Sequence, residues 1–274
     1  MRAIHKLICA LFCLVYSGFI YADVIDTKIQ ELIGTTTYTQ NKNFIDTIFA
    51  NKAKFYLENN TPNIGAIIYE LKNNGLLMLK FPQPMELQIS FESKSSLIAL
   101  SYTLNSLLSS MGYSYFMVSQ ASRVQGKSLL SYSLITEHAL DPIILYRELQ
   151  KRGFFLQDIA RKDINQWSYT VQAQNLQIFN AKTLTPNNTL ALREVSGQYW
   201  LNTPQSGILQ ITASPKWTPR IICYDKNLEI TQAIIEGNQK SSMSLRLDSA
   251  SVFVMITDVE NPDLIKQIEV KLGS

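Results

Sequence analysis

Two stretches of sequence decide the fold: LIALSYTLNSLLSSMG at residues 97–112 and DPIILYRELQKRG at residues 141–153. In both, leucine and isoleucine recur at the three- and four-residue spacing of an amphipathic helix. Asp141 is expected to cap the second helix, with Pro142 at its first position. Each stretch ends at a glycine, which is typical of a helix C-terminus. The sequence therefore predicts two helices of similar construction.

Both helices are followed by a pair of segments with the composition of β-strands. Leu104 aligns with Leu145, and Gly112 aligns with Gly153. The alignment indicates one αββ unit present in more than one copy. The expected strands are residues 113–119 and 129–135 in one copy, and 154–159 and 167–171 in the next.

The helix of an earlier copy of the unit is expected to begin at Thr61 and Pro62, as N-cap and first helical residue, and to end at Gly75. The strands of this copy are predicted at residues 76–81 and 86–91, joined by a turn at Pro82-Gln83-Pro84. Residues 61–174 are thus predicted to form a tandem αββ domain with one shared sheet and helices on one face, since a single unit cannot bury its apolar side. This arrangement resembles a ferredoxin-like sheet in topology.

The segments on either side of this array differ from it in composition. Residues 23–60 are expected to be a helical segment, with a helix at 24–33 closed by Gly34 and a polar linker at 35–43. Residues 175–189, rich in Asn, Thr and Pro, are expected to be an interdomain linker. From residue 190 to 274, short alternating stretches separated by turn residues predict a β-sandwich or jelly-roll domain. Strands are expected at 198–202, 207–213, 220–224, 231–235, 242–247, 251–256 and 266–272.

The C-terminal stretch resembles the bacterial pre-peptidase C-terminal domain. The resemblance rests on Gly207-Ile208-Leu209, the strand Ile222-Cys223-Tyr224 before Asp225, the Val252-Phe253-Val254 strand and the closing strand at 268–270. Ser249-Ala250 departs from the family, which usually has glycine before the valine-rich strand. The resemblance implies an exported β-sandwich accessory without chemistry of its own, acting in adhesion or in glycan or protein contact.

The N-terminus has the pattern of a cleavable secretory signal. Arg2 and Lys6 supply positive charge, residues 7–20 are an apolar run, and Ala22 is a small residue before Asp23. The run is shorter than the roughly 20 residues that a membrane-spanning helix needs. Residues 1–22 are therefore expected to be removed, leaving a periplasmic or secreted protein with no integral membrane span.

Net charge and the scarcity of reactive residues exclude several classes of function. The formal charge is +3 and falls to about +1 without Arg2 and Lys6, so nucleic acid is not expected as a partner. Removal of the signal also leaves Cys223 as the only cysteine and His138 as the only histidine. A typical zinc site needs more ligands than these, and no metal or cofactor is expected.

Two enzymatic hypotheses remain open at this point. His138 with Glu137 and Asp141 could belong to a hydrolase triad, although a loop capped by Asp141 explains the same residues. Cys223 could be a nucleophile, although its apolar strand context is typical of a small buried residue.

Three aromatic residues of the predicted sandwich are the candidate ligand-binding residues. Tyr199 and Trp200, with Trp217 in a loop between Pro215 and Pro219, could form a platform for sugar rings. Alternatively Trp200 is a core residue and Trp217 covers one end of the sandwich. The leading expectation is a non-enzymatic envelope protein that binds another protein. One possible binding mode is the addition of an extended partner segment to an open edge of the αββ sheet. A carbohydrate- or peptidoglycan-binding module is the alternative, and a hydrolase using His138 is the third.

Overall fold

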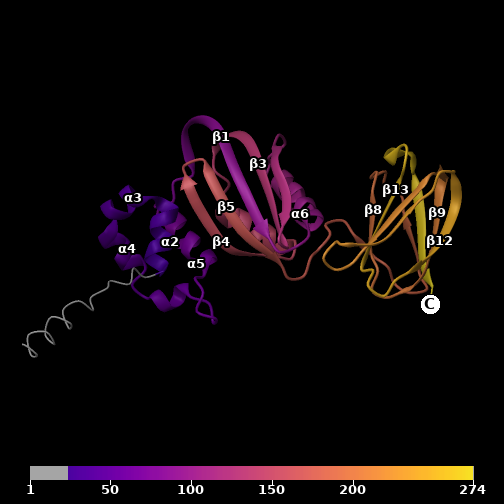
Figure 1. Ribbon diagram of the computed structural model, residues 1–274, viewed down its shortest axis with the longest axis horizontal. Coiled ribbons are helices and arrows are strands. Elements are labelled where there is room, and N and C mark those ends of the chain that lie inside the picture. The colour runs from indigo at the N-terminus through magenta and orange to yellow at the C-terminus, as the bar shows by residue number, and fades with distance from the viewer. Residues whose placement is uncertain (1–23, 274) are drawn as a thin grey trace, which may run out of the picture. The chain divides into compact units, whose positions relative to one another are not determined.

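The computed structural model describes residues 24–273, so the predicted signal at 1–22 lies outside the described residues (Figure 1). Helices and strands are both present, and the strands form several sheets. The prediction of a mixed α and β protein is confirmed at this level. The chain divides into two compact units between Met78 and Leu79. Within the described residues, no helix combines the length and the hydropathy that crossing a bilayer requires.

The first unit is helical. Ile25, Ile29 and Leu32 are fully buried along one side of its first helix, which ends at Gly34 as predicted. Phe49 packs on Phe55 with ring centroids 4.5 Å apart. The elements of this unit are α2 (Val24–Ile33), α3 (Thr35–Gln40), α4 (Lys42–Ile48), the 3-10 helix η1 (Lys52–Phe55) and α5 (Ile64–Asn73).

Two local predictions for this unit are wrong. The polar stretch 35–43 was expected to be a linker, but most of it is helical in α3 and the start of α4. Threonine has only modest helix propensity, so the neighbouring helices override the local preference. Helix α5 is capped by Asn63, whose side chain accepts a hydrogen bond from the amide of Ala66, and Thr61 lies in the turn before it.

The second unit begins with a five-stranded sheet in the order β2-β3-β1-β5-β4. The central strand β1 is antiparallel to β3 and parallel to β5. Helices α6 and α7 alternate with the strand pairs along the chain. The elements are β1 (Lys80–Ser93), α6 (Leu97–Ser110), β2 (Met117–Val124), β3 (Lys127–His138), α7 (Pro142–Lys151), β4 (Phe154–Asp163) and β5 (Gln166–Ala173).

The two helices begin and end where capping residues predict. Asp141 accepts hydrogen bonds from the amides of Ile143 and Ile144, which confirms its predicted role at the start of α7. Gly112 and Gly153 follow the helices with φ angles of 90° and 75°, which glycine adopts readily.

The sheet has one apolar face and one polar face. Leu87, Ile89 and Phe91 of β1 are fully buried on the apolar face. Tyr132 of β3 is buried on the same face, and its hydroxyl donates to Asn105 of α6, so α6 covers this face. The other face carries small and polar side chains of the same strands, including Gln88, Ser90, Ser131, Ser168 and Thr170.

The first of the predicted strand pairs does not form. Residues 76–81 and 86–91 were expected to be two strands around Pro82-Gln83-Pro84, but a single strand, β1, runs from Lys80 to Ser93. The pairing with β3 jumps from Lys80 and His138 to Met85 and Thr136, so the prolines lie in an irregular stretch. Proline is tolerated there because few ladder hydrogen bonds are lost.

The rest of the second unit consists of two further sheets, and we call residues 182–273 the C-terminal β part. The strand orders are β11-β10-β13-β8-β6 and β12-β9-β14-β7. The strands are β6 (Lys182–Thr183), β7 (Thr189–Leu192), β8 (Tyr199–Asn202), β9 (Gly207–Trp217), β10 (Pro219–Tyr224), β11 (Ile230–Ile235), β12 (Lys240–Leu247), β13 (Phe253–Asp258) and β14 (Gln267–Gly273), with the 3-10 helix η2 (Pro262–Leu264) before β14.

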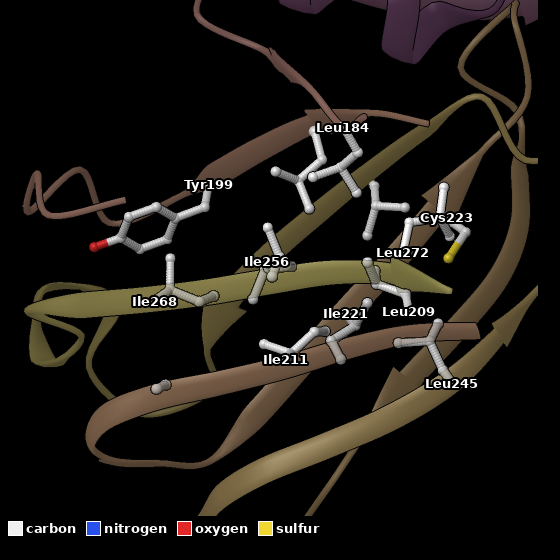
Figure 2. Packing of buried hydrophobic residues seen from close by; sticks show 14 of the residues in the cluster. Leu184, Tyr199, Leu209, Ile211, Ile221, Cys223, Leu245, Ile256, Ile268 and Leu272 are labelled. Atoms are coloured by element: carbon white, nitrogen blue, oxygen red, sulfur yellow. The ribbon is translucent and has the colours of Figure 1, made fainter. Parts of the chain in front are cut away.

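Side chains from both sheets meet in one apolar core. Figure 2 shows Ile221 and Ile256 of one sheet packed with Leu209, Ile211 and Ile268 of the other. Each of the seven strands expected from the sequence is present, with shifted ends. The sequence did not predict the short edge strands β6 and β7.

Candidate functional site

Trp217, one of the three predicted ligand-binding aromatics, is fully buried. It is the last residue of β9 rather than part of a loop, and its side chain belongs to the core between the two sheets. Its exposed fraction is 0%, and its indole nitrogen has no hydrogen-bond acceptor. As placed, Trp217 has no ring face for a ligand that arrives from solvent.

Tyr199 and Trp200 are adjacent in β8 and therefore point to opposite faces of their sheet. Tyr199 points into the core, as Figure 2 shows, and its hydroxyl donates to the carbonyls of Glu194 and Ile265. Trp200 points to the other side and is half-buried. The structure therefore does not bring Tyr199, Trp200 and Trp217 together as one platform.

Trp200 instead joins aromatic residues from other elements. Its ring stacks on Tyr224 of β10, with centroids 5.4 Å apart and an interplanar angle of 27°. Tyr102 of α6 approaches with its centroid 5.2 Å from that of Trp200. Nearby, Ser96 at the start of α6 donates a hydrogen bond to the carbonyl of Asn227 at 2.7 Å. Helix α6 thus supplies one wall of a site in the C-terminal β part.

Beside this aromatic cluster lies a pocket of about 610 Å³, which we call the Trp200 pocket. Its volume is within the range of roughly 300–1,000 Å³ that small-molecule sites occupy. Apolar rings and polar groups both line it. The lining residues are Tyr102, Phe179, Asn180, Lys182, Leu190, Ala191, Leu192, Arg193, Glu194, Ser196, Gln198, Tyr199 and Trp200.

One wall of the Trp200 pocket is fixed by a buried arginine. Arg152, 5% exposed, donates to Ser106, Ser110 and Glu148 and lies 5.9 Å from the ring centroid of Phe179. Hydrogen bonds from Lys151 and Arg152 lower the pKa of Glu148, so this carboxylate stays charged beside the arginine. Tyr102 donates a hydrogen bond to the carbonyl of Phe179 at 3.2 Å. These contacts hold both the backbone and the ring of Phe179, a residue that is 64% exposed.

The predicted catalytic candidates have ordinary structural surroundings. His138 is exposed at the end of β3, and Asp141 uses Oδ1 to cap α7. Cys223 is fully buried, as its strand context predicted, and burial raises the pKa of its thiol to about 11. At neutral pH this thiol is protonated and a poor nucleophile. Across residues 24–273, no group of His, Cys, Asp and Glu side chains is arranged to hold a metal ion.

The most exposed strand of the five-stranded sheet is β2. It lies at one end of the sheet, paired on one side only with β3. Seven of its eight residues are exposed, although three of them are large and apolar: Met117 at 70%, Val118 at 52% and Val124 at 65%. In the opposite edge strand, β4, only three of ten residues are exposed: Gln157, Lys162 and Asp163.

Two further exposed apolar residues adjoin β2. Tyr115, just before the strand, is 92% exposed, and Ile135 of β3 is 73% exposed. Met117 pairs with Ser133, two residues before Ile135 on the same side of β3. We call Tyr115, Met117, Val118 and Ile135 the β2 patch, although Val118 pairs with Tyr132 and therefore lies on the opposite face of the sheet from Met117 and Ile135.

The polar face of the five-stranded sheet forms a second hollow, of about 400 Å³. Two of its lining residues, Ser90 and Glu92, are paired with side chains of β3. Ser90 and Ser131 share a hydrogen bond of 2.8 Å, and Lys127 pairs with Glu92. Ser90 and Glu92 are therefore already paired within the sheet.

No family model and no curated protein matches this chain. Among solved structures, it is similar to the pre-peptidase C-terminal domain of a collagenase from Bacillus anthracis, with 10% identity and a TM-score of 0.25. The match covers 35% of this chain and 98% of the other. This is the family that the C-terminal sequence resembles, so that prediction is confirmed.

Sequence reasoning missed Tyr102, Phe179 and the β2 patch. Tyr102 has the spacing of a helix residue, and Phe179 lies in a stretch predicted to be a linker. Neither has a local signal that places it beside Trp200. The edge position of β2 depends on strand order, which a single sequence does not specify.

Proposed function

We propose that this protein is a non-enzymatic binding protein of the bacterial cell envelope, and that its second unit captures a partner protein by adding an extended segment of that partner to the free edge of β2. The observation on which the proposal rests is an eight-residue edge strand with seven exposed residues, three of them large and apolar. An open edge offers unpaired backbone N–H and C=O groups to another chain. Exposed apolar side chains on the same strand provide pockets or contacts for alternate side chains of that segment.

The β2 strand lacks several devices that usually protect an edge. Its sequence, MVSQASRV, contains no proline and no lysine, and its single charge, Arg123, is paired with Glu229 at 2.6 Å. Its pairing with β3 is irregular between Val118 and Gln120, and this irregularity is the one local feature that would protect the edge against pairing with another strand. A partner segment of five or six residues would satisfy the edge and cover Met117 and Val118.

The cellular setting of this proposal comes from the sequence. Arg2, Lys6 and the apolar run at 7–20 support export by a cleavable signal, with the mature chain periplasmic or secreted. The partner is then another envelope protein, and this chain is an accessory or scaffold of an envelope assembly.

We also propose the finer fold description on which this function draws. The αββ units α6-β2-β3 and α7-β4-β5 are two copies of one motif on either side of β1, related to a ferredoxin-like sheet with helices on one face. Both copies contain a helix, a glycine with positive φ and a strand pair, which supports the repeat. The C-terminal β part is a β-sandwich of the jelly-roll kind, supported by the shared core of its two sheets.

The experiment is crosslinking and affinity capture from bacterial envelope fractions with the tagged chain and two charge variants. Val118→Lys places a charge on the β2 patch, and Ile235→Lys places one on β11, an edge strand of another sheet where Ile235 is 63% exposed. Both changes are at exposed positions, so both variants should fold.

Capture of one or two stoichiometric proteins by the wild-type chain and by Ile235→Lys, with loss in Val118→Lys, would support the proposal. If both variants captured the partner equally well, or only Ile235→Lys failed, strand addition at β2 would be excluded.

A further inference from the structure

The Trp200 pocket is separate from the β2 patch and has the features of a small-molecule site. Four aromatic residues, Tyr102, Phe179, Tyr199 and Trp200, line it, and Phe179 is 64% exposed. The polar side chains of Asn180, Ser196 and Gln198 line the same pocket and are exposed. A ligand that suits this lining has apolar ring faces and hydroxyl or amide groups around its edge. Saccharides have this combination.

The charged residues of the pocket limit the class of ligand further. Lys182 and Arg193 line it together with a single acid, Glu194. Among the ion pairs between described residues, none involves Lys182, Arg193 or Glu194. By contrast, Arg152 is paired with Glu148 at 2.5 Å. Two exposed cations against one acid favour a ligand with one carboxylate, and an arginine can bind a carboxylate through two hydrogen bonds.

We propose that the Trp200 pocket binds a saccharide that carries a carboxylate. The Phe179 ring stacks on a sugar ring, Trp200 and Tyr102 form the floor behind it, and Arg193 binds the carboxylate. The buried Arg152 holds Phe179 in place from the opposite side. This site does not depend on strand addition at β2.

Isothermal titration with two matched probes tests the proposal. One probe is the disaccharide of N-acetylglucosamine and N-acetylmuramic acid, whose muramic unit carries a carboxylate, and the other is chitobiose, which is neutral. The wild-type chain should bind the acidic disaccharide on the order of tenfold more tightly than chitobiose. Sodium lactate, a carboxylate without a sugar ring, should bind far more weakly than either.

Three variants separate the contributions of ring and charge. Phe179→Ala should weaken the binding of both disaccharides by at least about tenfold, and Arg193→Gln should abolish the preference for the acidic one. The control is Ile235→Ala, an exposed position on β11, which is the edge strand of the sheet that contains Trp200. This variant should bind both disaccharides as the wild type does.

Tryptophan fluorescence supplies a second readout. Trp167 and Trp217 are 2% and 0% exposed, so a change in emission on binding should come from Trp200 and should disappear in Trp200→Phe. The proposal is overturned if neither disaccharide binds, if lactate binds as tightly as the acidic disaccharide, if Phe179→Ala binds as the wild type does, or if the pocket takes an extended peptide instead.

Discussion

Asp258 is a carboxylate with 2% exposure, and three backbone amides satisfy it. Its Oδ2 accepts from Thr218 at 2.6 Å, and its Oδ1 accepts from Glu260 and Asn261, each at 2.8 Å. Burial by itself raises the pKa of Asp258, but the hydrogen bonds from Asn261, Thr218 and Glu260 outweigh it and lower the pKa below its ordinary value. The carboxylate thus joins the end of β13 to the turn between β9 and β10.

Replacing Asp258 by asparagine should lower the free energy of unfolding by about 1–3 kcal/mol, because the amide group presents a donor where an acceptor is needed. Urea denaturation at neutral pH measures the change. The matched control is Asp248→Asn, since Asp248 is exposed and accepts from Ala250 in a turn that water also reaches. A loss as large in Asp248→Asn as in Asp258→Asn would contradict the assigned role.

The lowered pKa of Asp258 also predicts a pH dependence. A carboxylate with a depressed pKa stabilises the fold at pH values above its unfolded pKa of about 3.9, and this stabilisation is lost as the pH falls through the folded value. The difference in unfolding free energy between wild type and Asp258→Asn should therefore shrink below about pH 4. A difference that stayed constant down to pH 2 or so would show that the charge is not responsible.

Cys223 should be unreactive in the native protein. Burial raises the pKa of its thiol to about 11, so at neutral pH the thiolate is scarce as well as inaccessible. In a chain with Cys9 and Cys13 replaced by serine, a disulfide reagent should label Cys223 only as fast as the protein opens, and at once in urea. Rapid labelling of the folded chain would restore Cys223 as a candidate nucleophile.

The sequence could offer Trp200 as a candidate site residue, but it could not identify the residues that pack beside it. Alternation along a strand separates Tyr199 from Trp200, and this was available from the sequence. The sequence does not predict the burial of Trp217, because the two prolines near it are as compatible with a projecting loop as with the end of β9. Tyr102 reaches Trp200 only after two distant segments fold together.

Gly112 and Gly153 occupy the same place after α6 and α7, but their surroundings differ. A Cβ added to Gly112 would meet nothing within 4 Å, whereas one added to Gly153 would lie 1.7 Å from the carbonyl oxygen of Asn175. The carbonyl of Gly153 also accepts a hydrogen bond from the amide of Gln174 at 2.9 Å. Gly153 is therefore needed for close approach of two backbones as well as for its positive φ.

Substitution by alanine should separate these two requirements. Gly112→Ala should lower the unfolding free energy by about 1 kcal/mol, which is the approximate cost of positive φ for a residue with a Cβ. Gly153→Ala should cost at least about 3 kcal/mol, because the backbone near Asn175 must move as well. Urea denaturation of the two variants gives the comparison, and equal losses would contradict it.

The helices and strands whose ends are marked by capping residues, glycines or turns could be predicted from the sequence. The first helix, α6 and α7 have apolar spacing with capping residues or glycines, and the strands of the C-terminal β part alternate between turns. The helix α3 has no buried residue and no apolar pattern, so nothing local distinguished it from a linker. Strand β1 contains Pro82 and Pro84, and these prolines predict a turn. They are compatible with a strand only because the pairing with β3 is irregular between Lys80 and Met85.

For the whole molecule, composition and charge limited the possible functions more firmly than they specified one. The small net charge of the chain is the basis for not expecting a nucleic-acid partner. The division between Met78 and Leu79 was not foreseen, because the helix that ends at Gly75 has the same pattern as the helices of the sheet. Only the strand order reveals that β2 is an edge and that the sheet can accept another strand.

The measurement that tests strand addition most directly is amide hydrogen exchange of residues 117–124, in the free protein and in complex with the partner recovered from the envelope. An unpaired edge leaves about half of the β2 amides without an acceptor, so they should exchange quickly in the free protein. In the complex, exchange of these amides should slow by at least about tenfold, since each gains a hydrogen bond to the added strand. Unchanged exchange at 117–124, with protection appearing in another part of the chain, would contradict the proposed mode of binding.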